Sequence, residues 1–340
     1  MTVKPWVQRL VRILAILLLI GSLGLGWLWL DYRAFLDEPV NVPAHGLEFR
    51  IERGSNVRRI AAALASQGVI SQPTYLVVLA RLEPELHPIR AGVYAIKPGT
   101  RPRELLAQFV AGKVLEFSVQ FIEGWSFRQL RAELASAPRL KQTLTGLSDD
   151  EVMARLGHAG EHPEGRFFPD TYRYPVEDSD IAVLRRAYNA MSERLDRAWA
   201  QRDADLPYKS PYEALIMASI VEKETGVAEE RPAIAGVFVR RLRLGMRMDT
   251  DPSVIYGMGE RYDGNIRKKD LTEATPYNTY IIPGLPPTPI AMPGAQAIHA
   301  ALHPAPGKAL YFVAKGDGTH YFSDTLSEHN AAVRRYQLKK

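Results

Sequence analysis

The stretch Ile216–Gly226 reads IMASIVEKETG and joins a run of apolar residues to two glutamates. At about 100° per residue, an α-helix places Glu224 on the same side as Met217, Ile220 and Val221. A solvated glutamate needs no apolar neighbours on its own face. The stretch therefore predicts a buried helix that ends in carboxylates, with Glu224 among apolar side chains.

The end of this helix bears on the chemistry of its glutamates. Gly226 is placed just past the helix, where glycine adopts a left-handed conformation at little cost. Glu224 would then lie near the negative end of the helix dipole, and both the dipole and burial raise the pKa of a carboxyl. A carboxyl that stays protonated near neutral pH suits general-acid catalysis. The alternative is a solvated polar helix end, and periodicity alone does not choose between Glu222 and Glu224.

Composition sets the limits for the whole chain of 340 residues. Apolar residues make up 46%, which is enough for about two domains with sizeable cores. The absence of cysteine excludes disulfides, thiolate metal sites and a cysteine nucleophile. The net charge of +5 suits an acidic polymer or an anionic membrane surface. No long basic run with interleaved aromatics and no zinc-finger spacing occurs, so a nucleic-acid partner is not expected.

The N-terminal segment indicates a membrane anchor. Residues Ile13–Leu30 contain no charge, and with the residues just before them they reach the ~20 that span a bilayer. Lys4, Arg9 and Arg12 precede the segment and Asp31 follows it. The positive-inside rule then predicts a cytoplasmic tail over residues 1–9, a transmembrane anchor over 10–30 and everything later outside. No small-residue cleavage site is evident, which favours an uncleaved single-pass anchor. In a Gram-negative cell it would lie in the inner membrane, with a periplasmic remainder. A buried soluble helix is the alternative.

A short strand, a glycine turn, a Ser/Thr cap and an amphipathic helix follow one another three times after the anchor. Residues 31–46 first form a membrane-proximal stalk, which Pro39 and Pro43 would keep extended. The three glycine turns contain Gly54, Gly99 and Gly124. The first two copies resemble small LysM-like peptidoglycan-binding units, so a LysM-like subdomain is expected over residues 47–116.

The remaining sequence mixes helices and strands. Helices are predicted around 149–156, over 180–200 and twice between 211 and 244, with a final helix from Ser327. Residues 276–294 are dense in Pro and Gly and predict a long ordered loop. Residues 310–314 and 320–323 predict a hairpin. The fold class is therefore α+β: one N-terminal transmembrane helix, a small LysM-like α+β subdomain, and a mixed α+β domain over 117–336.

Two acidic stretches add candidate site residues. Glu164 and Asp170 lie among aromatic residues in EGRFFPDTY, a composition that suits sugar binding, although a packed loop capped by Asp170 is an alternative. Asp249 and Asp251 could hold a metal or line a cleft. Their spacing is not that of an EF-hand and no histidine is close in sequence, so no metal site is expected. A cap or turn is the structural alternative.

A polar stretch before the proline-rich loop is a further candidate. Tyr277, Asn278 and Tyr280 precede a stiff segment and could form the wall of a substrate groove, or simply a structural polar loop. His299 and His303 are four apart but lack the pattern of a zinc site. No phosphate loop, dinucleotide fingerprint or serine nucleophile elbow is present.

Taken together, these segments resemble the YceG-like family of endolytic murein transglycosylases. The resemblance covers nearly the whole chain, anchor included, and its motifs occur in the family's order. They are ASIVEKET at 218–225, RLRLGMR at 241–247, TDPSVIYG at 250–257, YNTY at 277–280, GLPP at 284–287, PG at 293–294, YFVA at 311–314, HYF at 320–322 and HN at 329–330. Arg166, Asp249 and Thr288 depart from the family pattern, which puts details of the groove in doubt.

The resemblance implies a function for Glu224, because the family's essential glutamate falls on this residue. A lytic transglycosylase cuts the bond between N-acetylmuramic acid and N-acetylglucosamine without adding water. Glu224 would act as acid and then base, and Glu164, Asp170 or Asp251 would stabilise the positively charged transition state. No cofactor or metal is implied. The implied partners are nascent glycan strands, whose elongation it would end, and peptidoglycan synthases.

Two other classes of function stay open at this point. YceG-like proteins have been labelled aminodeoxychorismate lyase-like, which would require pyridoxal phosphate and a Schiff-base lysine, with Lys223 the one lysine near the helix. An exported domain is a poor place for that chemistry. The other class is a non-catalytic, membrane-anchored peptidoglycan-binding scaffold, which would tolerate Glu224→Gln.

Overall fold

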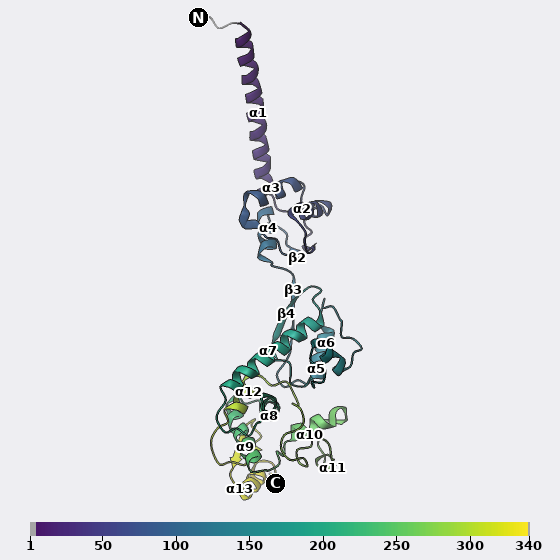
Figure 1. The fold of residues 1–340 in the computed structure, drawn as a ribbon, viewed down its shortest axis with the longest axis vertical. Coiled ribbons are helices and arrows are strands. Elements are labelled where there is room, and N and C mark those ends of the chain that lie inside the picture. The colour runs from purple at the N-terminus through teal and green to yellow at the C-terminus, as the bar shows by residue number, and fades with distance from the viewer. Residues whose placement is uncertain (1–4, 339–340) are drawn as a thin grey trace. The chain divides into compact units, whose positions relative to one another are not determined.

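The computed structural model describes residues 5–338, and the chain divides into two units, Met1–Glu116 and Phe117–Lys340 (Figure 1). The first four residues of the expected cytoplasmic tail, Lys4 among them, lie outside the described residues. The finer division of the chain predicted from the sequence stays a prediction.

The first unit begins with the long helix α1, Pro5–Asp37 (Figure 1). Within it, Trp6–Asp37 is long and apolar enough to cross a membrane, and its most apolar window is not buried in the protein. This confirms one N-terminal helix that could serve as an anchor. Its orientation and its membrane stay predictions.

The segment expected to form an extended stalk differs from that expectation. Helix α1 continues to Asp37, and Tyr32, Phe35 and Val40 are buried. Asp31 accepts a hydrogen bond from the Tyr75 hydroxyl at 2.7 Å. The physical reason is that aromatic side chains spaced by about one helical turn pack onto the unit. Tyr32, Phe35 and Val40 therefore contribute to the core of the first unit.

The rest of the first unit is a small α+β arrangement. Its strands pair antiparallel, with Phe49 opposite Tyr94, and both of these side chains are buried. Asn56, rather than the expected Ser or Thr, caps the first helix by accepting a hydrogen bond from Arg59 N at 2.9 Å. The elements are β1 Leu47–Ile51, α2 Val57–Ser66, α3 Pro73–Leu82, η1 Pro84–Leu86, β2 Gly92–Ile96 and α4 Pro102–Ala111.

The three copies of the predicted repeat do not form one arrangement in the structure. Strands β1 and β2 pair with each other, whereas β3 (Glu116–Gln120) pairs with β4 (Thr171–Pro175). The third copy has the expected Ser126 cap before α5, Phe127–Ser136. In the second copy Arg101 takes the cap position before α4, and Thr100 precedes it. The third copy thus begins the second unit and is not an extension of the first sheet.

The second unit confirms the helices and hairpin predicted for it. No helix or strand occurs between residues 276 and 294, as expected for a long loop. Its elements after β4 are α7 Asp180–Ala200, α8 Pro211–Glu224, η2 Ala228–Glu230, α9 Arg231–Arg243, α10 Asp251–Met258, η3 Gly259–Arg261, α11 Lys268–Thr272, α12 Ala295–Leu302, β5 Tyr311–Ala314, β6 His320–Ser323 and α13 Leu326–Tyr336, with α6 Asp149–Leu156 before β4.

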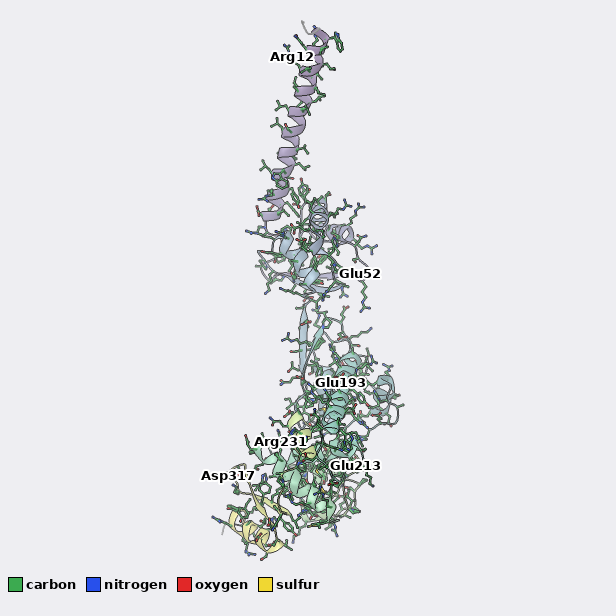
Figure 2. All side chains as sticks on the ribbon, turned by 60° about the vertical axis from the view of Figure 1, so that its left-hand side comes forward. Arg12, Glu52, Glu193, Glu213, Arg231 and Asp317 are labelled. Carbon is green, nitrogen blue, oxygen red and sulfur yellow. The ribbon has the colours of Figure 1, made fainter. Side chains whose placement is uncertain are left out.

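Helix α8 is the centre of this unit. All residues from Ala214 to Val221 are buried, because the helix is apolar on every side and packs against α7, α9, α10 and α12. Glu213, which is labelled in Figure 2, lies in its first turn. Arg231 of α9, labelled there as well, pairs with Glu222 in the last turn of α8. Thr225 ends the helix in an extended conformation with φ −145°. The predicted left-handed Gly226 is therefore wrong, because the chain leaves the helix directly into extended backbone.

Candidate active site

Glu224, the last residue of α8, lines a cleft of about 460 Å³. The Thr250 hydroxyl donates a short hydrogen bond to Glu224 Oε1. Thr250 is buried and directly precedes α10. Glu224 Oε2 makes no hydrogen bond with any residue of the described range, so this oxygen is left for a bound molecule.

The surroundings of Glu224 favour its protonated form. Burial raises the pKa of Glu224 to about 7, and the negative charge of Asp251 acts in the same direction. The Thr250 hydrogen bond and the Arg241 charge oppose this rise, because both stabilise the carboxylate. Near neutral pH, Glu224 is thus divided between acid and base forms, as a group that first donates and then accepts a proton requires.

A buried set of hydroxyl groups fixes Thr250. Its backbone N–H donates to Thr279 Oγ1 at 3.0 Å. Thr279 Oγ1 lies 2.8 Å from Ser253 Oγ, which in turn donates to the Thr250 carbonyl at 2.8 Å. The backbone N–H and carbonyl of Thr250 are therefore both held by buried hydroxyl groups, and this fixes the residue whose hydroxyl bonds Glu224.

Asp251 and Tyr280 line the same cleft as Glu224. Asp251 is the first residue of α10, and the Tyr280 hydroxyl donates to its Oδ1 at 2.7 Å. Burial and the Asp251 carboxylate raise the pKa of Tyr280, so its hydroxyl stays a donor. The structure thus brings together three of the predicted site residues.

The other glutamate of the helix end, Glu222, has a different environment. Its side chain is only 5% exposed and pairs with Arg231 at 3.0 Å. Its second oxygen accepts a hydrogen bond from Gly294 N at 2.9 Å. Burial raises the pKa of Glu222, while the Gly294 bond and Arg231 oppose this. The two glutamates that periodicity left equivalent differ, since Glu222 joins three helices and Glu224 lines the cleft.

Glu164 is buried and does not line the cleft. Its Oε1 accepts a hydrogen bond from Phe127 N at 2.9 Å, and its Oε2 accepts one from the Tyr256 hydroxyl at 3.0 Å. Burial raises its pKa to about 7, against the effect of these hydrogen bonds. Glu164 therefore connects the start of α5 to α10.

Asp170 and Tyr277 also lie away from the cleft lining. Asp170 is exposed, lies 4.0 Å from Arg194 and accepts a hydrogen bond from Thr171 N at 2.7 Å. The Tyr277 hydroxyl lies 2.9 Å from Thr288 Oγ1. Their roles in substrate binding stay predictions.

Asn278 is buried and shapes the loop that carries Tyr280. Its side-chain amide donates to the Asp270 and Glu273 carbonyls at 3.1 and 2.8 Å, and its Oδ1 accepts from Tyr280 N at 3.1 Å. Asn278 does not line the cleft, and its hydrogen bond to Tyr280 N holds the backbone of a residue that does. A direct contact of Asn278 with substrate also stays a prediction.

Four residues beside Glu224 were not among the candidate site residues, although each lies in a motif of the family resemblance. Thr250 holds Glu224, and Arg241, Tyr311 and His329 line the cleft. Arg241 reads as the basic end of a helix, and Tyr311 and His329 come from a hairpin and a helix about 90 to 105 residues later. Within residues 5–338, no group of three or more His, Asp or Glu side chains is placed to hold a metal ion.

Comparisons with known proteins place this geometry in context. The model of the YceG-like family matches residues 49–335. An endolytic murein transglycosylase of Bacillus subtilis is 31% identical over 329 residues, which are 91% of this chain and 90% of the relative. One of Streptococcus pneumoniae is 24% identical over 377 residues, and the match covers 99% of this chain and 66% of the relative. The crystal structure of a YceG-like protein from Listeria monocytogenes superposes with a TM-score of 0.55 at 28% identity, covering 85% of this chain and 99% of the other.

Proposed function

The chain belongs to the YceG-like family, and from this premise we propose that it is a peptidoglycan lytic transglycosylase with Glu224 as its acid and base. The bond cleaved would be the β-1,4 bond from N-acetylmuramic acid to N-acetylglucosamine, inside a nascent strand. The observation that carries the proposal is that Glu224 lines a cleft with Oε1 held by Thr250 and Oε2 without a partner among residues 5–338, and burial raises its pKa to about 7.

In the first step, protonated Glu224 donates its proton to the glycosidic oxygen. Thr250 holds Oε1, so the proton to be transferred is on Oε2. Protonation of the leaving oxygen breaks its bond to C1 of the muramic acid, and positive charge develops at C1.

In the second step, the Glu224 carboxylate takes the proton of the muramic acid C6 hydroxyl. The C6 oxygen then forms a bond to C1 and gives a 1,6-anhydro end. One C–O bond breaks and one forms, and the proton passes from O6 to the leaving oxygen through Glu224. Since the substrate supplies its own nucleophile, a second catalytic carboxylate, as hydrolases need, is unnecessary.

Asp251 is the group suited to stabilise the charge at C1. Of the three carboxylates considered for this role in the sequence, it is the one that lines the cleft with Glu224. The Tyr280 hydroxyl orients it at 2.7 Å. A fixed negative charge near a developing positive charge lowers the barrier without reorganisation.

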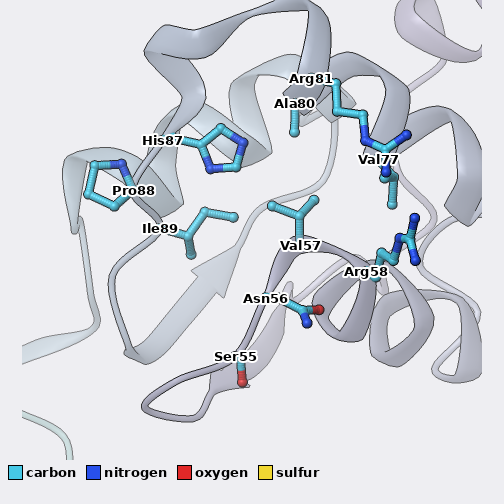
Figure 3. Close-up of a pocket in the computed structure, with 10 residues that line it drawn as sticks. All are labelled: Ser55, Asn56, Val57, Arg58, Val77, Ala80, Arg81, His87, Pro88 and Ile89. Carbon is cyan, nitrogen blue, oxygen red and sulfur yellow. The ribbon is translucent and has the colours of Figure 1, made fainter.

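A second cleft, in the first unit, would give affinity for glycan, as expected of a LysM-like subdomain. It measures about 510 Å³ and lies between the turn after β1 and the segment before β2. Figure 3 shows Arg58 and Arg81 on one side and His87 and Pro88 on the other. Val57 and Val77 line it as well. Apolar side chains beside hydrogen-bonding ones suit sugar rings, whose faces are apolar and whose edges carry hydroxyls.

The proposed location follows from α1. Arg9 and Arg12 precede its apolar segment and Asp31 follows, which supports a cytoplasmic N-terminus, an inner-membrane anchor and a periplasmic catalytic unit. There the enzyme would work beside peptidoglycan synthases and end the elongation of nascent strands.

Mass spectrometry of the products tests this proposal. Nascent glycan is incubated with the full-length protein in detergent, wild type beside Glu224→Gln. Anhydromuramic ends from the wild type alone are the expected result. Reducing ends would overturn the reaction class and indicate a hydrolase, with Asp251 or Asp170 as the second carboxylate. Glycan that is bound but cut by neither protein would indicate a scaffold.

A further inference from the structure

The cleft that contains Glu224 has a wall with no part in the two proton transfers. This wall is made of Arg241 from α9, Tyr311 from β5 and His329 from α13. The rings of Tyr311 and His329 stack with centroids 5.3 Å apart and planes 25° apart. The Arg241 guanidinium carbon lies 5.0 Å from the Tyr311 ring centroid. The three side chains thus form one compact group.

Arg241 is a hydrogen-bond donor held in one position. It is only 7% exposed. Its Nε donates to the Leu310 carbonyl at 2.7 Å, and its Nη1 donates to the Met248 carbonyl and to Asp249 Oδ2, both at 3.0 Å. Nη2 makes no hydrogen bond to any described residue of the chain. A rigid guanidinium with one unused nitrogen at a cleft is preorganised to donate to a ligand oxygen.

His329 has an unused nitrogen in the same wall. Its Nδ1 is buried and has no hydrogen-bond partner among residues 5–338. Buried polar atoms are almost always paired, so an unpaired one beside a cleft indicates a position for a ligand group. Burial and the Arg241 charge lower the pKa of His329, so its ring is neutral near pH 7. With its proton on Nε2, a neutral imidazole accepts a hydrogen bond at Nδ1.

We propose that Arg241 and His329 bind the acetamido group of an N-acetylhexosamine unit of the glycan. The acetamido carbonyl accepts from Arg241 Nη2, and its N–H donates to His329 Nδ1. One fixed donor beside one fixed acceptor complements an amide, which has both an acceptor and a donor. A carboxylate has no hydrogen to donate, so it could not bond the acceptor. Asp249 and Asp251 also line the cleft, and two carboxylates beside one guanidinium disfavour an anionic group. The assignment rests on the proposed function and adds a determinant of substrate specificity to it.

The test compares two substrates and three variants of the full-length protein in detergent. The substrates are glycan strands with their acetamido groups intact and the same strands after de-N-acetylation, at a pH where the free amine is neutral. His329→Phe keeps a ring against Tyr311 and removes the nitrogen. His329→Asn keeps an amide oxygen near the place of Nδ1. His158→Phe is the matched control, because His158 stacks on Tyr188 at 3.8 Å and does not line the cleft.

The expected result is a loss confined to one substrate. His329→Phe lowers kcat/KM on acetylated strands about tenfold, the usual effect of losing one hydrogen bond, and leaves cleavage of de-N-acetylated strands unchanged. His329→Asn recovers most of the loss, and His158→Phe changes neither substrate. An equal loss on both substrates would overturn the assignment, and so would a wild type that cuts both equally well.

A binding measurement tests the acetamido assignment independently of whether the proposed cleavage reaction occurs. Titration calorimetry with Glu224→Gln protein, with and without His329→Phe, measures affinity for acetylated and de-N-acetylated strands. Preference for the acetylated strand that His329→Phe removes supports the assignment even if no cleavage occurs. Absence of any preference overturns it, whatever the reaction proves to be.

Discussion

Glu164 is buried and Glu224 is half-buried in the same unit, and the loss of hydration raises the pKa of each to about 7. They differ in what their oxygens meet. Both oxygens of Glu164 accept hydrogen bonds from the protein, from Phe127 N and the Tyr256 hydroxyl. Glu224 receives one, from Thr250, and lines a cleft, where its other oxygen has no partner among residues 5–338. A raised pKa therefore reports burial, and access to a cleft distinguishes a catalytic acid from a structural one.

The largest expected difference is in activity. Glu224→Gln should lower the rate of glycan cleavage about 10³-fold, because the amide cannot donate or accept the transferred proton. Glu164→Gln should stay within about threefold of wild type, since an amide still pairs with Phe127 N or Tyr256. Initial rates of fragment release measure both. Equal losses in the two variants would remove the distinction between the two carboxyls.

The next effect concerns the hydroxyl that holds Glu224. Thr250→Val should lower kcat/KM about tenfold, as expected for one lost hydrogen bond to a reacting carboxyl, and Thr250→Ser should retain most activity. Thr288→Val is the matched control, because that hydroxyl pairs with Tyr277 away from Glu224. If Thr288→Val were as damaging as Thr250→Val, the loss would reflect general disruption of the unit.

The dependence of kcat/KM on pH should also distinguish Glu224 from Glu164. The cleavage step needs protonated Glu224, so kcat/KM should be level below pH 7 and fall about tenfold per pH unit above the pKa of about 7. Thr250→Val should move this fall to higher pH, because the Thr250 hydrogen bond lowers the pKa of Glu224. Glu164→Gln should leave it in place. If the fall in kcat/KM disappeared in Glu164→Gln, the titrating group would be Glu164 and the assignment to Glu224 would be wrong.

The smallest effect is on stability. A carboxyl whose pKa is higher in the folded state than in the unfolded state contributes stability below about pH 4.5, and this contribution is lost as pH rises to about 7. Glu224→Gln should therefore raise Tm by a few degrees at about pH 8 and leave it unchanged at about pH 4.5. Glu164→Ala should lower Tm at both, because Phe127 N and the Tyr256 hydroxyl lose their acceptor. Thermal melts at the two pH values check this, and a Glu224→Gln protein less stable than wild type at pH 8 would contradict it.

The sequence predicted the elements better than it predicted the site. The apolar run before Glu224 identified α8, since a helix apolar on all sides must be buried. Two short runs of strand-forming residues on either side of the turn at Gly316-Asp317-Gly318 identified the hairpin β5–β6. Glu164 looked like a sugar-binding residue because of its aromatic neighbours. In the structure Phe167 packs on Phe127 in the core, and Glu164 is buried beside them. Periodicity reports burial and does not report access.

Residues that meet only through the tertiary fold gave no local pattern that would join them in one site, although Thr250 and His329 each begin a motif of the family resemblance. Thr250 follows Glu224 by 26 residues, and His329 follows it by 105, with several helices between them. The extended stalk was wrongly predicted for residues 31–37, which belong to α1, for a similar reason. Pro39 and Pro43 indicated extended chain, whereas the preceding Tyr32 and Phe35 found a core to pack on that local patterns do not show.

The central claim is that one carboxyl, Glu224, carries both proton transfers and that water takes no part. Cleavage of nascent glycan by the full-length protein in water enriched in oxygen-18, followed by mass spectrometry of the new ends, tests it most directly. The account predicts anhydro ends that contain no oxygen-18. New reducing ends that each carry one oxygen-18 atom would contradict it, because they would show that water is the nucleophile.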